Sequence, residues 1–264
     1  MKPLSALSRE AARSLAGLVF DLDDTLLTRG ALASDAYVAL HALASNGLRL
    51  IACTGRPAAW GDLLARQWPV DMVVTENGAV AFTRTDGAPR RIERLSAGER
   101  RERHRALGAI VAELRERFAD VSPSDDSDWR VSDFAFDIGE RRRVPGERVA
   151  ALREAARSLG ARTFESSIHL HVTLDTDDKA SGTLRALAEV FGEDASSALA
   201  RYAFVGDSAN DEPCFSAFRT TFAVSNVKSE LGRLTVVPVY VSRRERGAGF
   251  AEIAEFLLCL REAA

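Results

Sequence analysis

Short apolar runs alternate with longer segments of helical spacing over the first third of the chain. Residues 18–20 are wholly apolar, and residues 48–53 and 71–75 are mostly so, which is typical of buried strands in a parallel sheet. Residues 31–44 carry apolar side chains at helical intervals, and Pro57 suits the first turn of another helix. Strands separated by helices predict parallel pairing in a doubly wound sheet.

The middle of the chain has a different pattern, which begins near residue 83 and ends near residue 177. Residues 132–138 and 168–174 alternate apolar with polar, and this predicts half-exposed antiparallel strands. Helical patterns cover residues 98–118 and 145–159. The remaining third returns to the first pattern: it predicts helices at residues 181–191, 212–218 and 250–260, and strands at 202–205, 221–224 and 236–241.

These patterns predict an α/β protein whose mainly parallel, doubly wound sheet is built from both ends of the chain. We expect a discontinuous core domain at residues 1–82 and 179–264. An α+β module, here called the inserted module, is expected at residues 83–178. A length of 264 residues suits a core domain plus one such module.

Composition narrows the class of protein and of partner. The net charge of −3 disfavours a nucleic-acid-binding protein, whose domain is normally basic. The longest apolar runs fall short of the roughly 20 residues that a membrane span requires, so no membrane partner is expected. Three cysteines far apart predict no disulfide framework and indicate the reducing cytoplasm. Residues 1–17 lack the apolar centre of a signal peptide and predict a short solvated helix or arm.

Several predicted strands run directly into oxygen-bearing side chains. Asp21 and Asp23 follow the first strand, Thr54 follows the second, and Asp207 and Asp211 follow the strand at residues 202–205. Ligands bind at the carboxyl ends of the strands in an open α/β sheet. Carboxylates that converge there would repel one another unless a hard cation neutralised them, and Mg²⁺ with oxygen ligands is the natural candidate.

The pair Asp21 and Asp23 fits phosphoryl transfer. One carboxylate attacks phosphorus and forms an acyl phosphate, while the other carries a proton to and from the reacting oxygens. The attack brings an anion to a phosphate dianion, and each unit charge pair costs roughly 4 kcal/mol at about 4 Å and an effective dielectric of about 20. Thr54, Lys179 and the metal are the groups available to offset that repulsion.

Four ordered motifs resemble those of the haloacid dehalogenase superfamily, in the subclass IIB (Cof-like and sucrose-phosphatase-like) with a large α/β cap. The motifs are residues 21–25, residues 54–56, Lys179 and residues 206–211. Residues 76–79 and 247–250 also resemble that subclass. The sequence departs from many relatives at Asp24, where they carry glycine. We interpret that change as chemically mild.

The resemblance implies a role for each matching residue. Asp21 is expected to be the nucleophile and a Mg²⁺ ligand, and Asp23 the general acid/base whose backbone carbonyl also binds the metal. Asp207 is expected to bind the metal, and Asp211 to contribute directly or through water. The residues expected around the substrate phosphate are Thr54, Gly55, Arg56, Asn77, Lys179 and Asn210.

Other polar side chains of the middle segment have weaker patterns. His169 and His171 project from one face of a predicted strand, so His171 is a candidate for the substrate pocket. The two histidines also fit an ordinary polar face, and a zinc site would need ligands that the sequence does not identify. The arginines of residues 100–105 predict a solvated helix face, and residues 141–143 a loop from which one arginine reaches an anionic substrate.

We therefore expect a Mg²⁺-dependent phosphatase of a small phosphorylated metabolite, with sugar phosphates as the class that the resemblance implies. The expected partner is a small-molecule substrate, and the sequence does not indicate an oligomeric state. A phosphomutase on the same scaffold is an alternative, because it would use Asp21 and Asp23 in the same way. A non-catalytic module that binds phosphorylated ligands is a second alternative, although binding alone requires no nucleophile.

Overall fold

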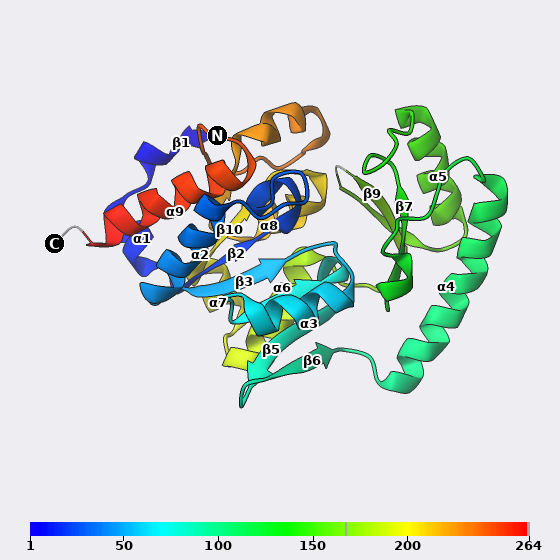
Figure 1. Ribbon diagram of the computed structural model, residues 1–264, viewed down its shortest axis with the longest axis horizontal. Helices are drawn as coiled ribbons and strands as arrows, with labels where there is room; N and C mark the ends of the chain where they lie inside the picture. The colour runs from blue at the N-terminus through cyan, green and yellow to red at the C-terminus, as the bar shows by residue number, and fades with distance from the viewer. Residues whose placement is uncertain (167, 263–264) are drawn as a thin grey trace.

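Two β-sheets organise the computed structural model, which describes residues 1–166 and 168–262 (Figure 1). The large sheet has nine strands in the order β1-β12-β11-β10-β2-β3-β4-β5-β6. Its strands are β1 (Lys2–Pro3), β2 (Gly17–Phe20), β3 (Arg49–Cys53), β4 (Met72–Thr75), β5 (Val80–Thr85), β6 (Ala88–Glu93), β10 (Tyr202–Gly206), β11 (Thr220–Ala223) and β12 (Tyr240–Val241). Along this order neighbouring strands from β1 to β4 pair in parallel. Strand β5 then pairs antiparallel with both β4 and β6.

Helices cover both faces of the large sheet, as a doubly wound fold requires. One apolar cluster packs the sheet against α1 (Arg9–Ser14), α2 (Ser34–Ser45), α3 (Ala58–Gln67) and α9 (Arg246–Glu262). A second cluster on the opposite face packs against α6 (Lys179–Phe191), α7 (Ala195–Arg201) and α8 (Glu212–Ala217). The predicted fold class, a mainly parallel α/β sheet with an inserted α+β module, is confirmed.

The small sheet belongs to the inserted module. Its strands are β7 (Asp133–Asp137), β8 (Arg162–Glu165) and β9 (His169–Thr173), in the order β7-β9-β8. An apolar cluster of its own packs this sheet against α4 (Ala97–Arg117) and α5 (Gly146–Ser158). In Figure 1 the carboxyl end of β3 points toward this module, drawn in green.

The prediction of half-exposed strands in this module is wrong for β9. All of its residues are buried, including His169 and His171. Leu170 and Val172 point into the module's apolar cluster, whereas the histidines point toward the large sheet. The polar alternation thus marks a second buried face, where the module docks on the core, because a polar contact surface has the same period as a solvated one.

Local sequence explains where the helices begin. Ser96 caps α4 and forms a reciprocal pair of hydrogen bonds with Glu99, and Asp178 caps α6 in the same way with Ser181. Pro57 precedes α3, where its fixed φ suits the helix entry. The capped start of α6 places Lys179 at the first position of that helix.

The amino-terminal segment corrects one expectation. It contains a helix, α1, but Leu4, Leu7 and Leu15 are buried, and β1 adds a strand to the large sheet beside β12. A solvated arm is therefore wrong, because these leucines pack into the cluster shared with α9. No helix within residues 1–166 and 168–262 is both long and apolar enough to span a bilayer.

The domain boundaries that we propose shift slightly at the first junction. Residue 82 falls inside β5, and β6 continues the same sheet as far as Glu93. The turn between these strands is Asp86-Gly87, with positive φ at both residues. We propose to place the start of the inserted module after Glu93, and to keep its end near residue 178.

Candidate active site

The carboxyl ends of three adjacent strands bring the predicted chemistry together. In the large sheet β2 lies between β10 and β3. Asp21 follows β2, Thr54 follows β3, and Asp207 follows β10. All three side chains are buried. Residues separated by more than 150 positions along the chain therefore meet at one edge of the sheet, under the inserted module.

Lys179 reaches this edge from the first turn of α6. Its Nζ lies 2.6 Å from Asp21 Oδ1 and 2.7 Å from Asp211 Oδ1. Burial disfavours the charged ammonium, but the two carboxylates outweigh burial and raise the pKa of Lys179 well above its ordinary value. The lysine therefore stays charged, and it fixes one oxygen of Asp21.

The carboxylates at this edge outnumber the lysine. Oxygens of Asp21, Asp207 and Asp211 all lie within 4.8 Å of one another. Burial, together with the repulsion of Asp211 and Asp23, raises the pKa of Asp21 to about 8 although Lys179 opposes the shift. Burial and neighbouring carboxylates also raise the pKa of Asp207 well above its usual range. Buried acidic oxygens in excess of positive charge are the donor set that a hard divalent cation fits.

Asp211 is held by the loop that it closes. One oxygen accepts hydrogen bonds from the backbone N–H groups of Asp207 and Ser208, and the other binds Lys179. A Cβ on Gly206 would lie 2.5 Å from the Asp211 carboxylate, so this loop needs glycine there. With one oxygen on the Lys179 ammonium and the other on two backbone N–H groups, Asp211 supports both Asp207 and Lys179.

Asp207 is oriented by two residues that the sequence did not single out for the site. Thr25 Oγ1 donates to Asp207 Oδ1 at 2.9 Å, and Asn226 Nδ2 donates to Asp207 Oδ2 at 2.8 Å. Asn226 also donates to the backbone carbonyl of Asp24. Thr25 was visible as the last residue of the first motif, but no sequence signal placed Asn226, which lies in a short 3-10 helix after β11.

Asp24 adopts a left-handed backbone conformation, with φ of 57°. This explains why glycine suits the position, since left-handed geometry penalises a side chain. The Asp24 carboxylate is bound by Arg246 Nε at 2.8 Å. Aspartate is one of the few residues other than glycine that adopt this conformation routinely, and here its carboxylate gains an ion pair with Arg246.

Asp23 is paired with Arg56. Arg56 Nε and Nη2 donate to the two oxygens of Asp23 at 2.9 and 2.7 Å. The Arg56 guanidinium also stacks on Trp60, with 4.7 Å from Cζ to the ring centroid. Arg56, which was predicted to contact the substrate phosphate, thus directs its guanidinium at Asp23, the predicted acid/base.

Thr54, Gly55 and Asn77 form the opposite side of the site. The Thr54 hydroxyl accepts a hydrogen bond from the Arg56 backbone N–H at 3.0 Å. A Cβ on Gly55 would lie 3.1 Å from His171 Nε2 and 3.3 Å from Asn77 Nδ2. Asn77 is buried, and neither its Nδ2 nor its Oδ1 has a hydrogen-bond partner among the described residues. Its free amide is available to a ligand.

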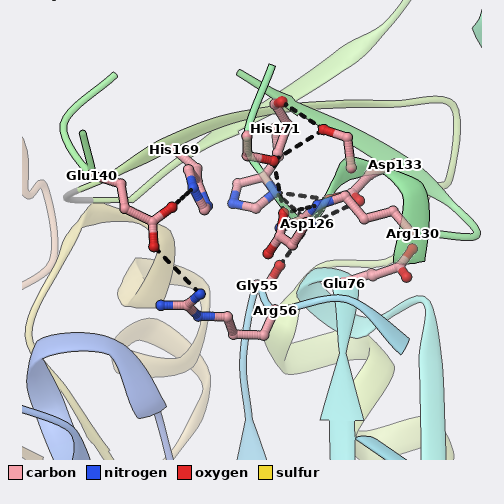
Figure 2. A network of polar contacts seen from close by, with 12 residues as sticks. Gly55, Arg56, Glu76, Asp126, Arg130, Asp133, Glu140, His169 and His171 are labelled. Carbon is pink, nitrogen blue, oxygen red and sulfur yellow. Dashed lines mark hydrogen bonds and ion pairs between the residues drawn. The ribbon is translucent and has the colours of Figure 1, made fainter. Parts of the chain in front are cut away.

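The two histidines of the inserted module lie over these strand ends. The His169 and His171 rings are 5.7 Å apart, so they share one face of β9 as predicted. A small closed cavity is lined by Asp21, Asp23, Gly55, Ser166, His169, His171, Ser208 and Asn210. His171 Nδ1 lies 2.8 Å from Asp133 Oδ2, and burial lowers the pKa of His171 to about 4, so its ring is neutral (Figure 2).

A larger cleft of about 710 Å³ opens beside Asp207, between the large sheet and the inserted module. Its charged lining consists of Asp24, Arg143, Arg153, Glu165, Asp207, Glu230, Arg233 and Arg246. Arg143 belongs to the loop at residues 141–143 from which an arginine was expected to reach a substrate. The size and polar lining of the cleft suit a small hydrophilic ligand.

The predicted solvated face of α4 is wrong for two arginines. Arg100 is buried, and it pairs with Glu93 at 2.9 Å and with Asp175 at 2.6 Å. Arg103 pairs with the same Asp175 at 2.9 Å. Arg101, by contrast, is exposed as expected. The buried pairs tie together the two chain segments that connect the large sheet to the inserted module.

Comparisons with known proteins agree with this geometry. The family model for haloacid dehalogenase-like hydrolases matches residues 18–148, which include the Asp21, Asp23 and Thr54 positions. No curated protein matches the chain in sequence.

Solved structures match over nearly the whole chain. Protein 0175 of Thermoplasma acidophilum is 20% identical with a TM-score of 0.71, and the match covers 92% of this chain and 98% of that one. A sucrose-phosphatase of Synechocystis sp. PCC6803, solved with sucrose and phosphate, is 17% identical with a TM-score of 0.65 and the same coverages, 92% and 98%. The subclass IIB sugar phosphatase BT4131 is 18% identical with a TM-score of 0.62, over 91% and 98%. By fold, strand-end motifs and family match together, the chain belongs to the haloacid dehalogenase-like hydrolases.

Proposed function

We propose that this enzyme is a Mg²⁺-dependent phosphatase of small phosphorylated metabolites, most simply sugar phosphates. One observation carries the proposal: the buried Asp21 carboxylate is fixed by Lys179 at 2.6 Å, two residues from Asp23, at the carboxyl edge of the sheet. A carboxylate so placed suits attack on phosphorus, since Lys179 screens the negative charge of the incoming phosphate. The names of two neighbours in fold, a sucrose-phosphatase and a sugar phosphatase, support the substrate class.

The reaction that we propose has two steps. An Asp21 oxygen attacks phosphorus, the bond from phosphorus to the leaving oxygen breaks, and Asp23 gives that oxygen its proton. Asp23, now ionised, takes a proton from water as the water oxygen attacks phosphorus and the bond to Asp21 breaks. Phosphate leaves, Asp21 is again a carboxylate, and Asp23 is again protonated.

The residues that would hold Mg²⁺ are the carboxylates of Asp21 and Asp207 and the backbone carbonyl of Asp23. Asp211 would support them through its bonds to Lys179 and to the Asp207 backbone. The ion supplies positive charge that offsets the repulsion between nucleophile and phosphate. Without such charge, the buried carboxylates at this edge retain protons, as the raised pKa of Asp21, about 8, indicates.

Substrate binding divides between the closed cavity and the cleft. We propose that the phosphate contacts Thr54, Lys179, Asn210 and the free amide of Asn77, close to Gly55. The remainder of the substrate would extend toward the cleft of about 710 Å³. His171 would line the boundary between the two regions, through the ring nitrogen that faces Gly55.

The compartment that we propose is the cytoplasm. Cys53, Cys214 and Cys259 are all free thiols, and the first two are buried. Free thiols without a disulfide among the described residues suit a reducing compartment.

The first experiment measures phosphate release from a panel of sugar phosphates and from a chromogenic aryl phosphate, with Mg²⁺ and with a chelator. We expect release only with Mg²⁺, and loss of at least about a thousandfold in Asp21→Asn, whose side chain cannot form the acyl phosphate. A folded protein that releases no phosphate from any substrate would overturn the proposal. Retained turnover in Asp21→Asn would instead overturn the assignment of the nucleophile.

A further inference from the structure

A chain of polar side-chain contacts leads from Asp23 out of the large sheet and into the inserted module. Its members are Asp23, Arg56, Glu140 and His169. Asp23 and Arg56 follow strands of the large sheet, whereas Glu140 and His169 belong to the module that carries the small sheet. Figure 2 shows Glu140 between the His169 ring and the Arg56 guanidinium.

Arg56 has little freedom to move. Its side chain is 9% exposed, two of its nitrogens bind both oxygens of Asp23, and its guanidinium stacks on Trp60. A planar guanidinium held in this way fixes the plane and direction of the carboxylate opposite it. The orientation of Asp23 therefore depends on where Arg56 is held.

Glu140 holds the remaining nitrogen of Arg56. Its Oε1 lies 3.6 Å from Arg56 Nη1, and its Oε2 accepts a hydrogen bond from His169 Nε2 at 2.8 Å. The bond from His169 keeps the pKa of Glu140 below its usual range, although partial burial opposes the shift. Glu140 thus remains a carboxylate and an effective partner for Arg56.

Hydrogen bonds from the backbone to Asp137 hold the turn that carries Glu140. Asp137, the last residue of β7, accepts hydrogen bonds from the N–H groups of Gly139 and Glu140 at 3.0 and 2.8 Å. His169 is buried on the adjacent strand β9, beside His171. A turn fixed to one strand and a buried ring on the next therefore set the place of the Glu140 carboxylate.

We propose that Glu140 and His169 are positioning residues that act through Arg56 to aim the Asp23 carboxyl group at the leaving-group oxygen. The inference rests on the proposed function, because it assumes that Asp23 transfers the proton. It adds that proton transfer is efficient only while the inserted module is docked. The module then both covers the substrate and completes the acid/base group.

Leaving-group chemistry separates this role from a merely structural one. An alkoxide is a poor leaving group and depends on the proton from Asp23, whereas a nitrophenolate leaves readily without it. Misdirected Asp23 should therefore slow hydrolysis of unactivated esters more than that of activated ones. Loss of module packing or of metal would slow all esters alike.

The test uses the full chain and a series of substituted phenyl phosphates of similar size, from nitrophenyl phosphate to phenyl phosphate, with an alkyl phosphate added. For His169→Ala, whose ring also lines the closed cavity, the readout is the ratio of kcat/KM on nitrophenyl phosphate to kcat/KM on phenyl phosphate, which should rise by about threefold or more. For Glu140→Gln, we expect kcat/KM on nitrophenyl phosphate within about threefold of the unmodified enzyme. On phenyl and alkyl phosphates we expect a loss of about tenfold or more, a fraction of the 10²–10⁴ that general acid catalysis supplies. The matched control is Glu154→Gln, an exposed carboxylate of α5 in the same module, which should leave the series unchanged.

A double-mutant comparison makes the route through Asp23 explicit. In an Asp23→Asn background the proton donor is absent, so Glu140→Gln should have no further effect on phenyl phosphate. Equal losses across the whole series, no loss on any ester, or full additivity with Asp23→Asn would each overturn the inference. If the unmodified enzyme releases no phosphate from any of these esters in Mg²⁺, the proposed function fails instead, and that result is seen before any variant is made.

Discussion

The carboxylate of Glu76 accepts two hydrogen bonds from Ser132, one from its backbone N–H at 2.6 Å and one from its hydroxyl at 2.5 Å. Glu76 follows β4 of the large sheet, and Ser132 precedes β7 of the small one. The same carboxylate accepts from the N–H groups of Val131 and Ala58. One buried side chain thus satisfies backbone donors from both parts of the protein and fixes the inserted module on the core.

Removing this carboxylate should destabilise the protein more than removing its hydroxyl partner. In Glu76→Ala the buried N–H groups of Ala58, Val131 and Ser132 lose their acceptor, which should cost more than about 3 kcal/mol in the free energy of unfolding. Ser132→Ala removes one hydroxyl bond and should cost about 1 kcal/mol. Urea unfolding measures both, and the control is Glu10→Ala, an exposed residue of α1, which should change the free energy of unfolding by less than about 0.5 kcal/mol. A Glu76→Ala midpoint equal to that of the control would contradict this account of docking.

Arg100 should matter for stability where its neighbour Arg101 does not. Arg100→Ala leaves the buried carboxylate of Asp175 with Arg103 alone, and we expect a loss of about 2–4 kcal/mol in unfolding free energy. Arg101→Ala removes an exposed side chain of the same helix and should change stability by less than about 0.5 kcal/mol. Similar urea midpoints for the two variants would show that the ion pairs at the module junction contribute no stability.

The contrast between these arginines illustrates what the sequence could and could not predict. The helical period of the apolar residues placed Arg100 and Arg101 on a helix at residues 98–118, close to α4 at Ala97–Arg117. They could not distinguish the arginine that meets Asp175 from the one that meets water, because that depends on a chain segment about 75 residues away. Tertiary contacts decide the environment of a charged residue, and period alone does not.

The candidate site was more predictable than its surroundings, for a physical reason. Asp21, Thr54 and Asp207 follow strands, and neighbouring parallel strands must end at the same edge, so their meeting followed from topology. Asn226 lies in a short 3-10 helix and Glu140 in a bend, and no local pattern gives the direction of either segment. Missed elements were also short or atypical: β8 has four residues, and the hairpin of β5 and β6 was visible only in its Asp86-Gly87 turn.

The stability that His171 and Asp133 contribute should be lost in acid in two stages. Burial lowers the pKa of His171 to about 4, although Asp133 opposes the shift, while Arg130 and His169 act in the same direction as burial. Below the ordinary histidine pKa of about 6.5 the unfolded chain takes up a proton that folded His171 does not, so stability is lost as the pH falls from about 6.5 to about 4. Burial would raise the pKa of Asp133, but Arg130 and His171 outweigh it and hold that pKa at about 2. The stability that ionised Asp133 contributes is therefore lost as the pH falls from about 4 to about 2.

Urea midpoints measured across this range check the first stage. His171→Gln removes the titrating ring, so between about pH 6.5 and 4 the slope of unfolding free energy against pH should be lower than in the unmodified protein, by up to about 1.4 kcal/mol per pH unit for one proton. The control is His41→Gln, because His41 is exposed on α2 and far from the docking face. An unchanged slope in His171→Gln, or an equal change in His41→Gln, would contradict the assignment to His171.

Mg²⁺ should stabilise the folded enzyme, independently of turnover. An ion that binds only the folded state at a hundred times its Kd adds about 2.7 kcal/mol, so the melting temperature should rise with added Mg²⁺. Asp207→Asn removes one of the three buried carboxylates within 4.8 Å of one another. We expect this variant to lose the response to Mg²⁺. Without the ion it should melt at or above the temperature of the unmodified protein, because the variant relieves repulsion that the ion would otherwise offset.

A surface aspartate distinguishes a specific site from general screening of charge by salt. Asp128 is exposed and lies outside the cluster of Asp21, Asp207 and Asp211, so Asp128→Asn should retain the full shift with Mg²⁺. Replacing Mg²⁺ with a monovalent salt at matched ionic strength should shift the melting temperature little in any variant. Such a salt only screens exposed charges and does not bind at a specific site. If Asp207→Asn and Asp128→Asn respond equally to Mg²⁺, the ion does not bind at the strand ends, and the excess of carboxylates there must be offset by retained protons instead.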